Sequence, residues 1–207
     1  MYKRQVNNIS FKVEKNKTLG LLGPNGCGKT TSIGMMLGLI NPTSGKILID
    51  GIELKPTNRI ELLSLMNFAS PYIELPKKLT VKQNLKVYAR LYGVKKIELR
   101  VNEMIEDLSL NKFVNKKTGE LSSGQKNRVA LAKSLINKPR LLFLDEPTAS
   151  LDPDVGDFVR EYIEKYKKNN ELTILLASHN MKEVERLCDE IIMMKHCLLY
   201  TSPSPRD

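Results

Sequence analysis

The chain has 207 residues, of which 41% are hydrophobic and 27% are charged, and its 33 basic and 23 acidic side chains give a net charge of +10. These fractions are ordinary for a globular protein and suit one α/β domain, and no apolar run approaches the roughly 18 residues that span a membrane. The lysine surplus is spread along the chain, which indicates a solvated surface or, as an alternative, a weak preference for an anionic membrane face. Because no compact basic run is interleaved with aromatic residues, we expect no nucleic-acid partner.

Both ends of the chain resemble translated sequencing adapter. Residues 197–207 match the conceptual translation of a transposase adapter, and residues 1–5 match its other strand with GTG read as a start. A natural Pro/Ser tail is the alternative. We therefore expect natural protein at 6–196, carrying 30 basic and 22 acidic residues and a charge of +8, with a gene that extends beyond both ends.

Periodicity predicts an α/β core interrupted by a helical segment. In the first half, the pattern predicts strands over 6–13, 19–22, 46–50 and 66–69, with helices over 31–39 and 59–65. Residues from about 80 to 137 have apolar side chains at helical spacing, which predicts a helical insertion. Beyond it, the pattern predicts strands over 141–144, 172–177 and 191–194, with helices over 153–168 and 181–187.

A glycine-rich stretch connects the strand predicted at 19–22 to the next helix. It fits G-x-x-x-x-G-K-[ST] and consists of Gly23, Pro24, Asn25, Gly26, Cys27, Gly28, Lys29, Thr30 and Thr31. Backbone N–H groups and a helix N-terminus can surround a phosphate there, with Lys29 reaching the β- and γ-phosphates and Thr30 offering its hydroxyl to Mg²⁺. A chance glycine-rich turn is the alternative, but it does not explain a strand and a helix on either side.

Two adjacent carboxylates follow the apolar strand predicted at 141–144. Asp145 and Glu146 would lie at the carboxyl end of a buried strand, where open α/β sheets bind ligands. Asp145 can hold Mg²⁺, and Glu146 can act as a general base or orient a water against the γ-phosphate. A surface Asp–Glu pair is the alternative.

A third motif, Leu121-Ser122-Ser123-Gly124-Gln125, precedes a predicted helix and alone would be an ordinary N-cap. With the phosphate loop, the run from Leu141 to Glu146, Ser150-Leu151-Asp152 and Ser178-His179-Asn180, its order and spacing resemble the ATP-binding-cassette (ABC) ATPases. The resemblance covers the chain except its ends. It implies a P-loop NTPase (RecA-like) core with an antiparallel β subdomain and an inserted α-helical subdomain.

The resemblance also implies a nucleotide-sandwich dimer that binds and hydrolyses ATP with Mg²⁺. Each ATP would lie between the phosphate loop of one subunit and the signature residues Ser122, Ser123, Gly124 and Gln125 of the other. Asp152 corresponds to the interface loop after the catalytic Glu146, and His179 to the histidine that contacts the γ-phosphate. Lys29, Glu146 and His179 would then be the catalytic groups, and Thr30 and Asp145 the metal ligands.

The sequence departs from the family at three places. Residues 69–76 contain no Gln where the family usually has one; Gln83 lies too far into the next helix to replace it, and Ser70 and Tyr72 are the candidates. Ser123 stands where Gly is usual. The stacking aromatic residue before the first strands is missing, because Tyr2 resembles adapter, so this fragment should bind ATP more weakly than a restored chain.

The cysteines indicate a cytosolic, reducing compartment, because only Cys27 and Cys188 are natural and they form no disulfide or metal pattern. Cys27 lies in the phosphate loop near Lys29 and a helix N-terminus, which favour a thiolate. Two interpretations stay open: a reactive thiol that ATP protects from reagents, or a small residue whose N–H alone matters.

The leading hypothesis is the ATPase subunit of a membrane exporter, because residues 79–93 and 178–189 resemble the export-type subfamily. The loop from Ser70 to Leu79 would receive the coupling helix of a separate permease at the cytoplasmic face of the membrane. The ATPase partner would be a second copy or a paired subunit. The alternatives are a soluble ABC ATPase acting on ribosomes or DNA, which usually carries two cassettes or long coiled coils, and an importer ATPase.

Overall fold

The structure is a computed structural model that describes residues 6–71, 74–149, 151–195 and 198–201. Its centre is a six-stranded sheet in the order β4-β5-β6-β1-β7-β8. The strands are β1 (Thr18–Leu22), β4 (Met66–Ala69), β5 (Leu141–Asp145), β6 (Thr173–Ser178), β7 (Glu190–Lys195) and β8 (Leu198–Thr201). The first five of these in sheet order run parallel, so their carboxyl ends share one edge, and only β8 pairs antiparallel.

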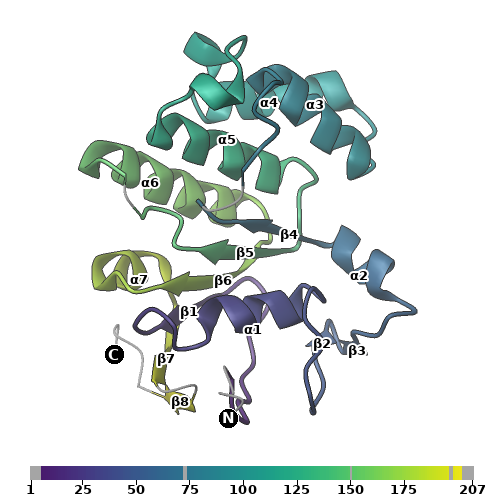
Figure 1. Cartoon of the computed structure of the whole chain (residues 1–207), viewed down its shortest axis with the longest axis vertical. Helices are drawn as coiled ribbons and strands as arrows, with labels where there is room; N and C mark the ends of the chain where they lie inside the picture. The colour runs from purple at the N-terminus through teal and green to yellow at the C-terminus, as the bar shows by residue number, and fades with distance from the viewer. Residues whose placement is uncertain (1–5, 72–73, 150, 196–197, 202–207) are drawn as a thin grey trace.

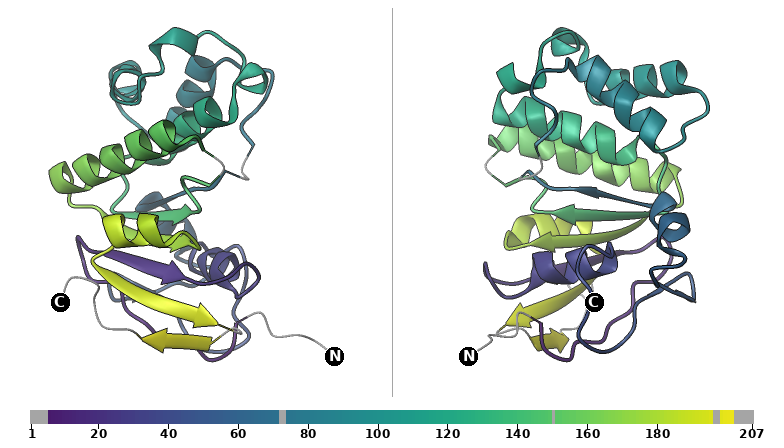
Figure 2. Two further views of the ribbon diagram at one scale, coloured as in Figure 1. Left: turned by 90° about the vertical axis from the view of Figure 1, so that its left-hand side faces the viewer. Right: turned by 45° about the vertical axis from the view of Figure 1, so that its right-hand side comes forward.

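Helices cover both faces of the sheet (Figures 1 and 2). On one face lie α1 (Lys29–Met36) and α2 (Arg59–Ser64), and on the other α5 (Ser123–Leu135), α6 (Pro153–Asn169) and α7 (Met181–Leu187). Helices α3 (Val81–Leu91) and α4 (Ile97–Asp107) pack on each other and on α5, at one end of the long axis. Two short 3-10 helices, Asn111–Phe113 and Thr118–Glu120, and a hairpin of β2 (Leu48–Ile49) and β3 (Ile52–Glu53) complete the described elements.

The core forms as two apolar layers because side chains of a strand alternate between its faces. In β5, Leu142 and Leu144 join the layer under α5, α6 and α7, whereas Phe143 joins the layer under α1 and α2. Gly20 lets α7 approach β1 closely, since a Cβ there would lie 2.7 Å from Cys188 Sγ. Cys188 is fully buried and therefore serves as a packing residue.

The predicted helices and strands after residue 17 appear within a few residues of their expected limits. The strand predicted over 6–13 is wrong: Ile9, Phe11 and Val13 do pack on the core, but the described backbone there joins no sheet. Asn8 adopts a positive φ of 50°, a left-handed conformation that interrupts an extended strand. The strand predicted over 46–50 shortens to Leu48–Ile49.

Strand β8 lies within 197–207, the range expected to be adapter. Its backbone pairs with β7, with Lys195 opposite Leu198. The adapter origin of both ends stays a prediction. Within the described parts of the chain, none of the helices combines the length and apolar character needed to cross a lipid bilayer.

Candidate nucleotide site

The phosphate-loop motif joins β1 to α1 and leaves the start of α1 open. Gly28 is the N-cap residue with φ 108°, no side chain caps this helix start, and no acidic residue lies in its first turn. Gly26 also has a positive φ, of 79°. These left-handed positions favour glycine, and they turn the backbone so that the positive end of the helix faces an incoming anion.

Gly23 fixes the beginning of this loop against two strands. Its N–H lies 3.4 Å from Ser178 O at the end of β6. A Cβ at Gly23 would lie 2.3 Å from Met194 O in β7, closer than any side chain permits. Only glycine fits at this point.

Lys29 points back into the loop. Its Nζ donates hydrogen bonds to Gly23 O at 2.6 Å and Pro24 O at 3.2 Å, and it lies 3.9 Å from Glu146 Oε1. The residue is 5% exposed. A buried ammonium held by carbonyl oxygens inside a glycine loop can exchange them for the oxygens of a phosphate.

Thr30 and Asp145 bring two oxygen ligands together. The Thr30 hydroxyl donates to Asp145 Oδ2 at 2.9 Å across the gap between α1 and β5. Burial raises the pKa of the Asp145 carboxyl and the nearby Glu146 charge adds to this, while the Thr30 hydrogen bond and Lys29 oppose it. A hydroxyl beside a carboxylate is a donor set that fits a hard cation such as Mg²⁺.

Glu146 and His179 lie side by side at the carboxyl edge of the sheet. His179 Nδ1 is 2.7 Å from Glu146 Oε1, and the Glu146 side chain is 8% exposed against 54% for His179. Glu146 has a positive φ of 53°, and its N–H donates to Ala177 O at 2.8 Å. The Glu146 carboxylate thus lies next to Lys29, where it can accept a proton.

The ABC transporter family model matches residues 6–149, which contain the phosphate loop, the signature motif, Asp145 and Glu146. The chain belongs to the ABC transporter family. It is therefore an ABC ATPase domain, and the α/β fold with its small antiparallel sheet agrees with that.

Relatives and a solved neighbour agree with this ABC assignment. The ABC transporter ATP-binding protein NatA of Bacillus subtilis is 36% identical over 196 residues, covering 92% of this chain and 78% of NatA. The Nod factor export ATP-binding protein I of Rhizobium etli is 37% identical over 195 residues, covering 93% of this chain but only 61% of that protein. A dimeric ATP-binding cassette in a post-hydrolysis state, bound to ADP and Pi, has a TM-score of 0.88 at 24% identity, with 98% of this chain and 91% of that chain covered, which is a likeness of fold.

The signature motif of this ABC domain begins α5, which lies on the opposite face of the sheet from α1 and its phosphate loop. Figures 1 and 2 show α5 above β4 and β5, while α1 lies beside β1 lower along the same axis. Ser122 is exposed and caps α5 in a complete capping box, in which its Oγ accepts from Gln125 N and its own N–H donates to Gln125 Oε1. Ser123 and Gly124 form the first turn of α5. Asp152 is the exposed N-cap residue of α6, with no side-chain cap bond, and Ser150 lies outside the described residues.

The loop after β4 is described only in part. Ser70 is buried, at 5% exposure, whereas Tyr72 and Ile73 lie outside the described residues. Gln83 does not replace the usual Gln of this loop, because its Oε1 accepts a hydrogen bond from Thr80 N in the capping box of α3. What replaces the usual Gln therefore stays a prediction for Ser70 and Tyr72.

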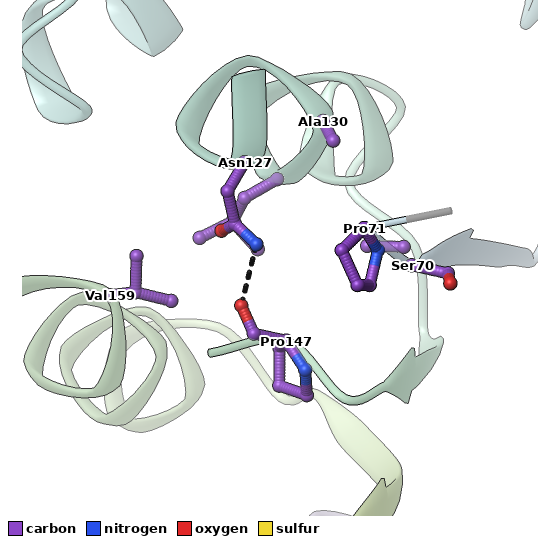
Figure 3. A pocket seen from close by; sticks show the side chains of 8 residues that line it. Ser70, Pro71, Asn127, Ala130, Pro147 and Val159 are labelled. Atoms are coloured by element: carbon purple, nitrogen blue, oxygen red, sulfur yellow. Dashed lines mark hydrogen bonds between the residues drawn. The ribbon is translucent and has the colours of Figure 1, made fainter. Parts of the chain in front are cut away.

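A small recess lies beside this loop, between α5, α6 and the chain after β5 (Figure 3). It has room for about one water molecule and is therefore too small for a nucleotide. Its lining consists of Ala69, Ser70, Pro71, Asn127, Ala130, Leu131, Pro147 and Val159. Asn127 Nδ2 donates to Pro147 O at 2.7 Å across it, which ties α5 to the residue that follows Glu146.

Cys27 is 4% exposed and belongs to the apolar layer under α1. A Cβ at Gly23 would lie 2.8 Å from its Sγ. This burial argues against a reactive thiol, and it adds a packing contact of the side chain to the interpretation in which the N–H alone matters.

Sequence reasoning missed a buried polar group behind His179. Glu183 on α7 is 1% exposed and accepts hydrogen bonds from Ser178 Oγ at 2.7 Å and Thr148 Oγ1 at 2.6 Å. The available signal was Asn180 followed three residues later by Glu183, which resembles a capping box. That signal predicts an exposed helix start and not a buried carboxylate.

Proposed function

We propose that this ABC ATPase domain hydrolyses ATP to power substrate export through a separate membrane permease. The observation that carries the proposal is the Glu146 carboxylate, which lies 2.7 Å from His179 and 3.9 Å from Lys29 at the edge of the sheet beside the open start of α1. Export is favoured over other uses of ATP because Nod factor export proteins are among its relatives.

In this proposal each residue of the site has its own role in hydrolysis. Lys29 and the backbone of residues 23–31 bind the β- and γ-phosphates, and Glu146 accepts a proton from the attacking water as that water bonds to the γ-phosphorus. The bond from the γ-phosphorus to the bridging oxygen then breaks, and ADP and phosphate leave. His179 holds the Glu146 carboxylate and contacts the γ-phosphate. Mg²⁺, held by Thr30 and Asp145, would neutralise charge that develops on the phosphate oxygens.

The proposed active form is a dimer. Residues 122–125 and the loop at Asp152 would complete the site of a second copy, or of a paired ATPase subunit, because α5 and α1 lie on opposite faces of the sheet in one chain. Ser122 can still donate its hydroxyl proton to a phosphate while its oxygen caps α5. The region from Ser70 to Leu79 would meet the permease, which would hold the domain at the cytoplasmic face of the membrane.

The first test compares ATP turnover of the wild type with that of Glu146→Gln. If Glu146 is the general base, turnover falls by about 10²- to 10⁴-fold while ATP binding is retained. Glu171→Gln, a matched change at an exposed glutamate, should leave turnover unchanged. Retained turnover in Glu146→Gln would remove Glu146 from this role.

The transport part of the proposal has its own test. Source DNA is read past both ends of the gene. A neighbouring gene with several apolar spans of membrane length would support a permease partner. A second phosphate loop in the same reading frame would instead indicate a tandem soluble ATPase and contradict the export proposal.

A further inference from the structure

Both oxygens of the buried Glu183 carboxylate accept hydrogen bonds. Oε2 accepts from the hydroxyl of Ser178, the last residue of β6 and the residue before His179. Oε1 accepts from the hydroxyl of Thr148, two residues after Glu146. One carboxylate therefore joins the loop that carries His179 to the loop that carries Glu146.

The first turn of α7 explains why Glu183 turns inward. In α3 and α5 a Gln at the third helical position reaches back to the N-cap N–H, as Gln83 and Gln125 do. At α7 the N-cap N–H of Asn180 donates instead to Ser178 Oγ at 3.0 Å, and the Ser178 hydroxyl in turn donates to Glu183. Inserting Ser178 between the two partners of a capping box frees the Glu183 side chain to reach Thr148.

Thr148 makes a second contact that orients its hydroxyl towards Glu183. Arg160 Nη1 donates to Thr148 Oγ1 at 3.2 Å, so that the Thr148 proton is directed to Glu183. Burial raises the pKa of Glu183 and the Glu146 charge adds to this, while the bonds from Thr148 and Ser178 and the positive charge of Arg160 oppose it in part. A buried carboxylate needs such partners, because leaving it without them is costly.

We infer that Glu183 is a positioning residue for ATP hydrolysis, whose carboxylate bridges Ser178 and Thr148 and so sets the separation of His179 from Glu146. The inference rests on the proposed ATPase function. Within the described residues, the Glu183 carboxylate hydrogen-bonds to neither His179 nor Glu146; it acts through the two hydroxyls that flank them.

The test variant is Glu183→Gln, which keeps the size of the side chain but replaces one acceptor by an amide. We expect kcat to fall by about 10- to 100-fold, the range for a small misplacement of catalytic groups, with KM for ATP within about twofold of the wild type. The matched control is Glu185→Gln, because Glu185 is exposed on the same helix. An unchanged kcat in Glu183→Gln would overturn the inference, as would a lower melting temperature accompanied by equal loss of ATP binding.

A second measurement reports geometry without turnover. The protein is labelled with ¹³Cε1-histidine, and the His196→Gln variant assigns the two histidine resonances. We expect the His179 resonance to move in Glu183→Gln and to stay in place in Glu185→Gln. A resonance that does not move would contradict the bridge. If the wild type shows no ATP turnover, the proposed function fails, and this resonance alone still decides whether Glu183 positions His179.

Discussion

Helices α1 and α5 both begin with residues typical of helix N-termini, yet their starts are built in opposite ways. At α1 the N-cap is Gly28, which offers no side chain, and the backbone of the loop is left-handed there. At α5 Ser122 and Gln125 exchange hydrogen bonds in a complete capping box, and Thr80 and Gln83 do the same at α3. The α5 and α3 starts are stabilised by their own side chains, whereas the α1 start gains no such bond.

In α3 and α5, folding itself supplies the side-chain bonds of the first turn. In α1, the N-cap residue supplies no such bond, and the first turn is left for a ligand. The capped starts of α3 and α5 contribute to stability in the free chain. The start of α1 keeps its positive end for an anion, and residues around it, Lys29 and Glu146 among them, are held by unusual backbone and by buried polar contacts. Substitutions at the two kinds of start should therefore affect different properties.

The largest effect is expected for Gly23→Ala at the open start. The added Cβ would lie 2.3 Å from a backbone carbonyl, which cannot move aside cheaply, so we expect a loss of about 3 kcal/mol in the free energy of unfolding together with weaker ATP binding. Gly45→Ala is the control, because nothing lies within 4 Å of the added Cβ, and its cost comes from a left-handed φ of 87° that Gly23 does not share. That variant should lose about 1 kcal/mol and keep its ATP affinity. Urea unfolding measures both, and equal losses would contradict the steric explanation.

An intermediate effect is expected at Lys133, the cation buried among the capped helices. Its Nζ lies over the rings of Tyr88 and Tyr92, and burial lowers the pKa of its ammonium to about 8 from an ordinary 10.5. Between these values the unfolded chain binds one proton more than the folded one, so this group adds stability as pH rises from 8 towards 10.5. Lys133→Met removes that dependence.

The measurement is urea unfolding of the wild type and Lys133→Met at pH 7 and pH 10. We expect the stability of the wild type relative to the variant to increase by about 2 kcal/mol between the two pH values. Lys126→Met, at an exposed lysine of the same helix, is the control for general charge effects. A relative stability that stays flat with pH would show that the Lys133 ammonium is not desolvated.

The smallest effect, and the sharpest comparison, is between Ser122→Ala and Thr80→Ala. Each removes the hydroxyl of a complete capping box, so each should cost about 1 kcal/mol of stability. If the start of α5 completes the site of a second copy, only Ser122→Ala should also slow ATP turnover. Equal turnover in the two variants would show that the cap at Ser122 has a structural role alone.

Most of the fold follows from local patterns. The fully apolar run Leu141–Leu144 predicts β5. The phosphate-loop motif, which is typical of a strand-to-helix connection, predicts β1 before it and α1 after it. The segment over 6–13 is an exception, because its alternation predicts a strand that does not form. Phe11 and Val13 pack on the core from a segment outside the sheet, and the positive φ of Asn8 could not be read from the pattern.

The site was predictable only where a motif names its residues. Lys29, Thr30, Asp145, Glu146 and His179 come from separate motifs, and the structure brings them into bonded pairs. The Glu183 bridge depends on Thr148, 35 residues earlier in the chain, and no local pattern encodes such a pairing. The burial of Cys27 is equally a tertiary property, set by the layer beneath α1.

The contact of Gly23 with β7 and β6 has a mechanical consequence. The backbone of Gly23 packs closely against Met194 O and its N–H is bonded to Ser178 O, so this side of the site leaves no room for the loop to shift. The half-exposed ring of His179 and the exposed cap of α5 are not wedged in this way. We therefore expect any tightening around a bound nucleotide to come from His179 or, in the proposed dimer, from the start of α5 in the second copy.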